Sequence, residues 1–132
     1  MTPRWPTTGA PTPREAARLQ ERWRARVVRR GSFARLRTVA GMDVGLGAST
    51  ARAAACLMSY PDLEPLGEAT AELPLEFPYV PGLLGFREVP ALTLALERLG
   101  IVPDLLLVDG HGLAHPRRFG VACPLGVTTG LP

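Results

Sequence analysis

Three acidic side chains occur where the surrounding sequence is otherwise apolar or turn-forming. Asp43 lies within an apolar stretch, Asp109 directly follows an apolar run at 105–108, and Glu88 falls in the first turn of an expected helix. A carboxylate inside an apolar strand costs several kcal/mol of desolvation unless a cation or a hydrogen-bond donor meets it. Three oxygen ligands without paired Cys or His residues suit Mg²⁺, with Mn²⁺ as a substitute, rather than zinc.

The three acids together favour a site for metal-assisted phosphodiester chemistry. Two divalent ions held about 4 Å apart can clamp the attacking and leaving oxygens of a phosphodiester. Taken singly, each acid has an ordinary alternative: Glu88 is a favourable residue for the first turn of a helix, and Asp109 could cap a turn. Their joint occurrence at these positions favours the metal site.

The stretch 78–82 is expected to form a rigid loop with an exposed ring. Pro78 and Pro81 restrict the backbone, and Tyr79 lies between them. An exposed aromatic ring beside a metal–phosphate site could wedge into a base stack and hold open the gap left by an extruded nucleotide. The alternative is a tyrosine that only covers the edge of the core, and the motif alone does not decide between the two.

A second loop, 109–118, combines glycines with basic side chains. Glycine at 110 lets the backbone approach a ligand closely. His115 can donate or accept a hydrogen bond, and Arg117 and Arg118 can reach phosphate. Glycine and proline in this loop argue against a helix that presents both histidines to one metal ion. A surface loop with incidental histidines is the alternative, and we favour ligand binding.

The elements that must position these residues follow from periodicity and turn signals. A capping box at Thr12, with proline at the first helical position, starts a helix that is expected to run to about Arg30. Three strands, at 38–45, 51–60 and 66–73, favour an antiparallel meander because their links are short. The remaining chain predicts a loop at 74–85, a helix at 86–99, a strand at 104–108 that is buried on both faces, a loop at 110–120 and a short helix at 121–129.

This order of elements predicts an α/β fold with a mixed sheet and flanking helices. It resembles a ribonuclease-H-like sheet, in which three antiparallel strands and a helix precede a fourth strand that runs parallel to the first. Because the first and fourth strands are neighbours in such a sheet, Asp43 and Asp109 would lie close together.

Charge is distributed unevenly along the chain. All fifteen basic residues are arginine. Residues 1–40 hold ten arginines against two glutamates, whereas residues 41–132 hold five arginines against ten acids. A basic arm ahead of an acidic body suggests a polyanionic partner, although a solvated basic helix would have the same composition.

The length of 132 residues predicts one domain, over 12–132, behind a flexible tail at 1–11. No apolar run approaches the ~20 residues needed to span a bilayer, and no signal peptide is recognisable. We therefore expect a cytoplasmic protein with no membrane partner. Its two cysteines occur in separate motifs and are expected to be buried, reduced thiols.

Three motifs taken together resemble the endonuclease V family. They are GMDVG (41–45), PYVPGLLGFRE (78–88) and VDGHGLAHPRRFGVA (108–122), in the order and spacing of the family. The resemblance covers about residue 12 to the end. It implies a ribonuclease-H-like fold and Mg²⁺-dependent repair cleavage of nucleic acid that contains deaminated adenine. The cut would fall at the second phosphodiester bond 3′ to inosine or deoxyinosine, in DNA or in RNA.

The resemblance also implies roles for individual residues. Asp43, Glu88 and Asp109 match the catalytic, metal-binding carboxylates of the family. Pro78, Tyr79, Val80 and Pro81 match the wedge that separates strands, and Gly82, Leu84, Gly110, His115 and Val121 match the pocket for the flipped hypoxanthine. Arg117 belongs with the other expected contacts to nucleic acid.

The chain departs from the family pattern in two ways. Cys123-Pro124 stands where the family usually has a Ser-His pair, and the sequence stops where the resemblance implies a further strand–helix–strand unit with a lysine and another metal ligand. We therefore expect a sheet that is incomplete at the C-terminus and that self-associates through its exposed face. The alternative function is a catalytically impaired, inosine-binding fragment of the same family. A junction resolvase is disfavoured by the 78–81 loop.

Overall fold

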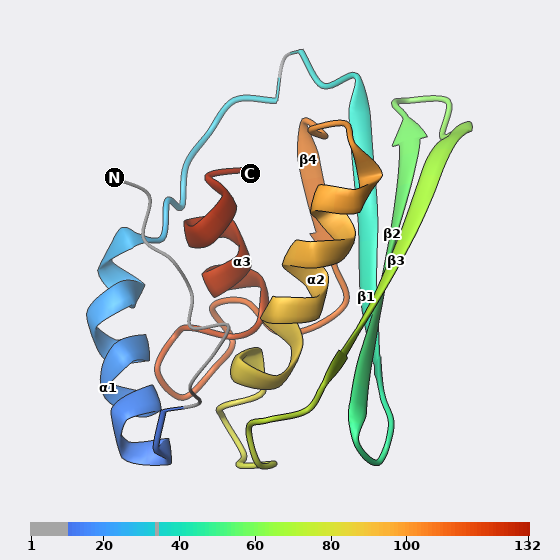
Figure 1. Cartoon of the computed structure of the whole chain (residues 1–132). Coiled ribbons are helices and arrows are strands. Elements are labelled where there is room, and N and C mark those ends of the chain that lie inside the picture. Colours follow the sequence, from blue (N-terminus) through green and yellow to red (C-terminus); the bar gives the residue numbers. More distant parts are fainter. Residues whose placement is uncertain (1–10, 34) are drawn as a thin grey trace.

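The computed structural model describes residues 11–33 and 35–132. The elements run in the order α1 (Pro13–Trp23), a short 3₁₀ helix η1 (Arg24–Arg26), β1 (Thr38–Leu46), β2 (Thr50–Ser59), β3 (Pro65–Pro74), α2 (Gly85–Leu99), β4 (Leu105–Val108) and α3 (Ala122–Thr129) (Figure 1). The expected tail at 1–11 falls, apart from its last residue, outside the described residues. In the described part of the chain, no helix is long and apolar enough to cross a membrane.

The four strands form one mixed sheet in the order β3-β2-β1-β4. β1 pairs antiparallel with β2 and parallel with β4, and β2 pairs antiparallel with β3. This arrangement confirms the expected meander and the parallel fourth strand. Its strand boundaries lie within one or two residues of the expected ones.

Hydrogen bonds at both ends of β4 fix its register against β1. The carboxylate of Asp104, just before β4, accepts the backbone N–H of Arg37 at 2.9 Å and of Thr38 at 3.0 Å. These hydrogen bonds hold the pKa of Asp104 below its ordinary value. After β4, the backbone N–H of Asp109 donates to the carbonyl of Met42 at 3.0 Å. The register therefore places Asp109 beside Asp43, as expected.

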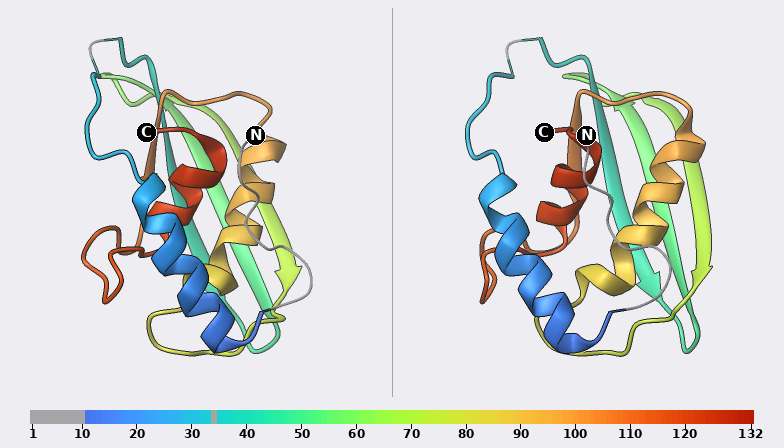
Figure 2. Two further views of the ribbon diagram at one scale, coloured as in Figure 1. Left: turned by 90° about the vertical axis from the view of Figure 1, so that its left-hand side faces the viewer. Right: turned by 60° about the vertical axis from the view of Figure 1, so that its left-hand side comes forward.

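All three α-helices lie on one side of the sheet (Figures 1 and 2). α2 packs against β2 and β3, and α3 packs against α2. Every second residue of β2 from 51 to 55 is a buried alanine, because side chains alternate between the two faces of a strand. These small residues let α2 approach the sheet closely, and its Phe86, Val89 and Leu92 fill the core.

No described helix covers the other face of the sheet, here called the open face, and this overturns two expectations. Leu107 of β4 is 58% exposed, so the strand is not buried on both faces. Cys56 of β2 is also exposed, and only Cys123 is buried. An apolar strand composition does not reveal which faces the described elements cover. The outer edge of β4 does gain one partner, because the N–H of Leu106 donates to the carbonyl of Pro132 at 2.9 Å.

The N-terminal helix begins as expected but ends early. Thr12 and Glu15 form the predicted capping box. α1 then tightens into η1, and Val27 has an extended backbone with φ −69° and ψ 121°. The expected continuation to Arg30 is therefore wrong. Two consecutive β-branched residues, Val27 and Val28, lose side-chain freedom in a helix and favour this exit.

Candidate active site and nucleic-acid interface

The three carboxylates predicted as metal ligands come from β1, α2 and the end of β4. Asp43 and Asp109 are exposed and line one hollow of about 540 Å³ on the open face of the sheet. Glu88, in the first turn of α2, is only 8% exposed. The expected burial of Asp43 is therefore wrong, because strand alternation turns Met42 into the core and Asp43 to the open face.

The buried carboxylate is influenced by both exposed ones. Burial, and after it the negative charges of Asp43 and Asp109, raise the pKa of Glu88 from 4.5 to about 7, while Arg87 acts in the opposite direction. The carboxylate of Asp43 accepts the backbone N–H of Val44 at 2.7 Å. Carboxylate groups that repel one another favour the binding of a hard divalent cation, because the cation neutralises their charges. In chemistry, the three acids thus fit Mg²⁺.

In geometry, the three acids do not form a ready-made cage. Within residues 11–33 and 35–132, no three His, Cys, Asp or Glu side chains are gathered closely enough to hold a metal ion as they stand. Asp43 and Asp109 line the hollow on the open face of the sheet, whereas Glu88 belongs to α2, which packs on the other face. The structure brings the acids within electrostatic reach of one another without bringing them into a coordination shell.

The loop at 78–82 presents its tyrosine to solvent. Tyr79 is 69% exposed, and the guanidinium of Arg87 lies over its ring at 5.7 Å from the ring centre. The loop is anchored just before this point, where the buried ring of Phe77 stacks on Phe86 with 5.1 Å between the ring centres. The loop is thus fixed at its start and exposed at its tip. This arrangement suits a tyrosine ring that must enter a stack of nucleobases without folding back onto the protein.

The carbonyl oxygen of Gly82 links its own loop to α1 and to the 109–118 loop. It accepts from Gln20 Nε2 at 3.0 Å, from His115 Nε2 at 2.7 Å and from Arg117 Nη2 at 3.1 Å. Arg117 Nε donates in turn to Gln20 Oε1 at 2.6 Å. Gly82 has a φ of +83°, and a Cβ there would stand 2.8 Å from Arg117 Nη2. The backbone conformation therefore favours glycine at this position, and a larger residue would also displace the guanidinium of Arg117.

The hydrogen bonds of His115 assign its proton. Its Nδ1 accepts the backbone N–H of Arg117 at 3.0 Å and of Phe119 at 3.3 Å, so the proton of the neutral ring lies on Nε2 and is donated to Gly82. Burial lowers the pKa of His115, and the Gly82 hydrogen bond opposes this. His115 is thus a neutral residue that orders the loop, and its ring is engaged with the backbone.

The remaining residues expected in the pocket are Leu84, Gly110 and Val121, of which Gly110 and Val121 lie in contact. A Cβ on Gly110 would stand 2.3 Å from Val121 Cγ1, so the glycine is what allows the chain after Asp109 to pass Val121. Val121 is buried, whereas Leu84 is 38% exposed. The structure thus pairs Gly82 with His115 and Gly110 with Val121.

Sequence reasoning missed Gln20, although it left a signal. Ala16, Gln20 and Trp23 are the buried residues of α1, and they recur at helical spacing. A polar residue on an otherwise apolar stripe indicates a side chain with buried partners. Gln20 is 1% exposed and bonds both Gly82 and Arg117. The basic N-terminal helix is therefore docked against both loops of the candidate interface.

Comparison with known proteins places this geometry in context. The model of the family described as Endonuclease V matches residues 21–132. Endonuclease V of Roseiflexus castenholzii is 53% identical over 118 residues, which cover 89% of this chain and 53% of that protein. Endonuclease V of Nocardia farcinica is 49% identical, over 96% of this chain and 58% of that protein. The chain spans about half the length of the curated relatives it matches.

Solved structures agree with the sequence relatives. The crystal structure of endonuclease V from Streptomyces avermitilis superposes with a TM-score of 0.89 at 43% identity, and covers 100% of this chain and 60% of that one. Endonuclease V of Ciona intestinalis, crystallised with DNA that contains an inosine followed by a ribo-adenosine, superposes with a TM-score of 0.81 at 29% identity, over 89% of this chain and 54% of that one.

Proposed function

Because the chain belongs to the endonuclease V family, we propose that it serves as a metal-dependent endonuclease in nucleic-acid repair. The substrate is nucleic acid that contains inosine or deoxyinosine, and the cut falls at the second phosphodiester bond 3′ to that base. The observation that carries the proposal is the placement of Asp43 and Asp109 within electrostatic reach of Glu88, whose pKa is raised to about 7 by burial and, after it, by the charges of these two acids. A carboxyl group with a strongly raised pKa close to an open hollow is typical of catalytic sites.

We propose Asp43, Glu88 and Asp109 as the ligands of Mg²⁺, with Mn²⁺ as a substitute. The bound cation would polarise the phosphodiester and neutralise charge on its oxygens. The chain contributes placement: the parallel pairing of β1 and β4 holds two carboxylates at the rim of one hollow, and α2 brings the third from the covered face. A phosphodiester can reach the two exposed carboxylates directly from solvent.

We propose that lesion recognition belongs to the two loops. Pro78, Tyr79, Val80 and Pro81 form the wedge, and the exposed ring of Tyr79 supports this role. The pocket for the flipped base uses Gly82, Leu84, Gly110, His115 and Val121. Arg117 supports the pocket through its hydrogen bond to Gly82. The relative from Ciona intestinalis that was crystallised with inosine-containing DNA makes inosine the base to test first.

A second candidate function is inosine binding without cleavage. It is favoured by a contrast within the described residues, where the Gly82 junction is fully hydrogen-bonded while the acids form no ready-made metal cage. On this alternative, recognition is intact and turnover is impaired.

One experiment separates the two functions. The chain is incubated with Mg²⁺ and an end-labelled oligonucleotide that carries a single inosine, beside a matched strand with adenine, and both cleavage and binding are measured. A nick at the second phosphodiester 3′ to inosine, lost in Asp43→Asn, supports the endonuclease. Binding that prefers inosine without a nick supports the binding function. Equal behaviour towards the inosine and adenine strands would contradict both.

A further inference from the structure

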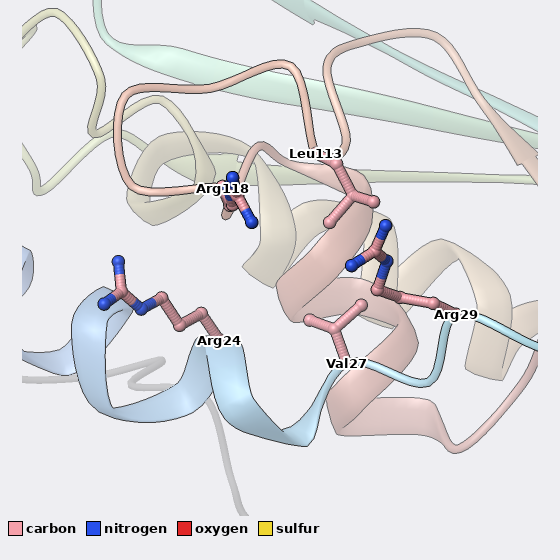
Figure 3. Close-up of a pocket in the computed structure, with 5 residues that line it drawn as sticks. All are labelled: Arg24, Val27, Arg29, Leu113 and Arg118. Carbon is pink, nitrogen blue, oxygen red and sulfur yellow. The ribbon is translucent and has the colours of Figure 1, made fainter.

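A second cavity lies on the side of the molecule where η1 faces the 110–120 loop. Its volume is about 590 Å³, and it is lined by Arg24, Val27, Arg29, Leu113 and Arg118. Figure 3 shows Leu113 and Arg118 reaching in from the loop, and the other three from the N-terminal segment. A cavity of this size takes a nucleotide-sized group rather than a single water or ion.

None of the three guanidinium groups of this cavity forms an ion pair with a described residue. Within the described residues, the one ion pair joins Arg52 to Glu72 on β2 and β3, and none of the three cavity arginines has a side-chain hydrogen bond. All three are exposed. Like charges that line one hollow repel one another, and a phosphate group would offset this repulsion through charge-assisted hydrogen bonds.

The early end of the N-terminal helix creates this arrangement. Arg24 begins η1, and the extended backbone at Val27 carries Arg29 towards the loop. On the opposite wall, consecutive arginines face different surroundings. Arg117 is engaged by Gln20 and the Gly82 carbonyl, whereas Arg118, with a φ of +54°, lines the cavity. A non-glycine residue in this backbone region is uncommon and is often found at functional sites.

The loop wall is held rigid by its own backbone. Gly120 N–H donates to the Gly112 carbonyl at 2.8 Å, and Arg118 N–H donates to the His115 carbonyl at 2.9 Å. A Cβ on Gly120 would stand 2.4 Å from the carbonyl oxygen of His111, so the two arms of the loop cross in close contact. Arg118 and Leu113 are therefore presented on a fixed frame, which reduces the ordering that binding requires.

We propose that this cavity binds one backbone nucleotide of the nucleic-acid strand, at a position outside the lesion. The arginines contact its phosphate, and Val27 and Leu113 contact its sugar. The site rests on the proposed function, because that function supplies the strand. Its contribution is independent of base identity, since a phosphate and a sugar carry no sequence information. It adds affinity for any strand and leaves the choice of inosine to the two loops.

The test compares two variants that lose the same charge. In the cavity variant, Arg24→Gln, Arg29→Gln and Arg118→Gln are combined. In the control, Arg14→Gln, Arg18→Gln and Arg22→Gln are combined, because these arginines are exposed on α1 and do not line the cavity. Binding of a labelled single strand without inosine, as DNA and as RNA of the same sequence, is measured by fluorescence anisotropy across a salt series. Melting temperatures establish that both variants fold.

We expect the cavity variant to bind about tenfold more weakly at low salt. Its slope of log affinity against log salt should fall by about 0.7, because that is roughly the contribution of one phosphate contact to a single strand. The control should lose less than about threefold, since separate exposed charges are screened. The loss should be alike for DNA and RNA, and the preference of the cavity variant for inosine should equal that of the parent.

Three results would overturn the site. They are equal losses in the two variants, no loss in either, and a parent chain that does not bind the inosine-free strand. Failure of the proposed function looks different. A parent that binds inosine and adenine strands equally, yet loses affinity only in the cavity variant, would retain the nucleotide site and refute inosine recognition.

Discussion

Glu88→Gln should make the folded chain more stable at neutral and alkaline pH while abolishing cleavage. The pKa of Glu88 rises from 4.5 to about 7 through burial and the charges of Asp43 and Asp109. Such a rise corresponds to roughly 3 kcal/mol, at about 1.4 kcal/mol per tenfold change in proton affinity. Glutamine keeps the shape of the side chain but cannot ionise, so the variant avoids this charge in the core.

The sign follows from where the proton binds more tightly. The folded chain holds the Glu88 proton up to about pH 7, whereas the unfolded chain releases it near 4.5. This carboxyl therefore stabilises the fold fully below pH 4.5, and its contribution is lost as the pH rises through 7. The free energy of unfolding of Glu88→Gln, measured relative to the parent, should rise by roughly 3 kcal/mol between about pH 4.5 and pH 8.

Urea unfolding, followed by circular dichroism across that pH range, provides the measurement. Glu97→Gln is the matched control, because Glu97 is an exposed acid of the same helix; its curve should run parallel to that of the parent. Above pH 7, Mg²⁺ should raise the melting temperature of the parent and leave that of Glu88→Gln almost unchanged. Parallel pH curves for parent and Glu88→Gln would refute the coupling of the three acids, and equal stabilisation by Mg²⁺ would refute Glu88 as a ligand.

Three further outcomes are expected. Tyr79→Ala should weaken binding to an inosine-bearing strand by about 1–3 kcal/mol, the value of one aromatic–base stack; an equal loss for a plain strand, measured by anisotropy, would contradict the wedge. Gln20→Ala should lower the free energy of unfolding by about 2–3 kcal/mol, because one neutral and one charged hydrogen bond are lost. The control Arg18→Ala should change it by less than about 0.5 kcal/mol. Urea unfolding of the two variants measures the difference. Because burial lowers the pKa of His115, the unfolded chain takes up this proton first, so stability should fall as the pH drops below 6.5. His115→Gln should remove that part of the slope, measured in the Glu88→Gln background, and an unchanged slope would show that His115 is not responsible.

The order of the strands was predictable because local patterns determine it. The apolar run of β2, the turn at Pro61-Asp62 and the short apolar run of β4 each indicate an element within a few residues. The pairing of β1 with β4 then follows from the resemblance to a known sheet. What the sequence did not reveal is which face the helices cover. That single unknown misplaced Asp43 in the core, and Leu107 with it.

The candidate site was predictable in its residue types and less so in its connections. The acids and the two loops carry recognisable patterns, whereas the junction at Gly82 is a backbone carbonyl, which leaves no mark in a sequence. The cavity arginines were hidden by the expected helix to Arg30, because a continuous helix would have pointed Arg29 elsewhere. The β-branched Val27 and Val28 favour the early end of the helix, but propensity of this kind is too weak to predict where a helix stops.

The junction at Gly82 also bears on how the chain folds. Its hydrogen bonds join residues that are 62 positions apart for Gln20 and 33 for His115, and the bond from Arg117 to Gln20 spans 97. Contacts of such long range form slowly, because the intervening chain must first be closed into loops. The β1–β2–β3 meander and α2 can assemble from nearer neighbours, whereas the pairing of β4 with β1 joins segments 66 positions apart, so β4 and the interface should form after the meander. Recovery of nucleic-acid binding during refolding would then lag behind recovery of secondary structure, and would report the arrival of α1.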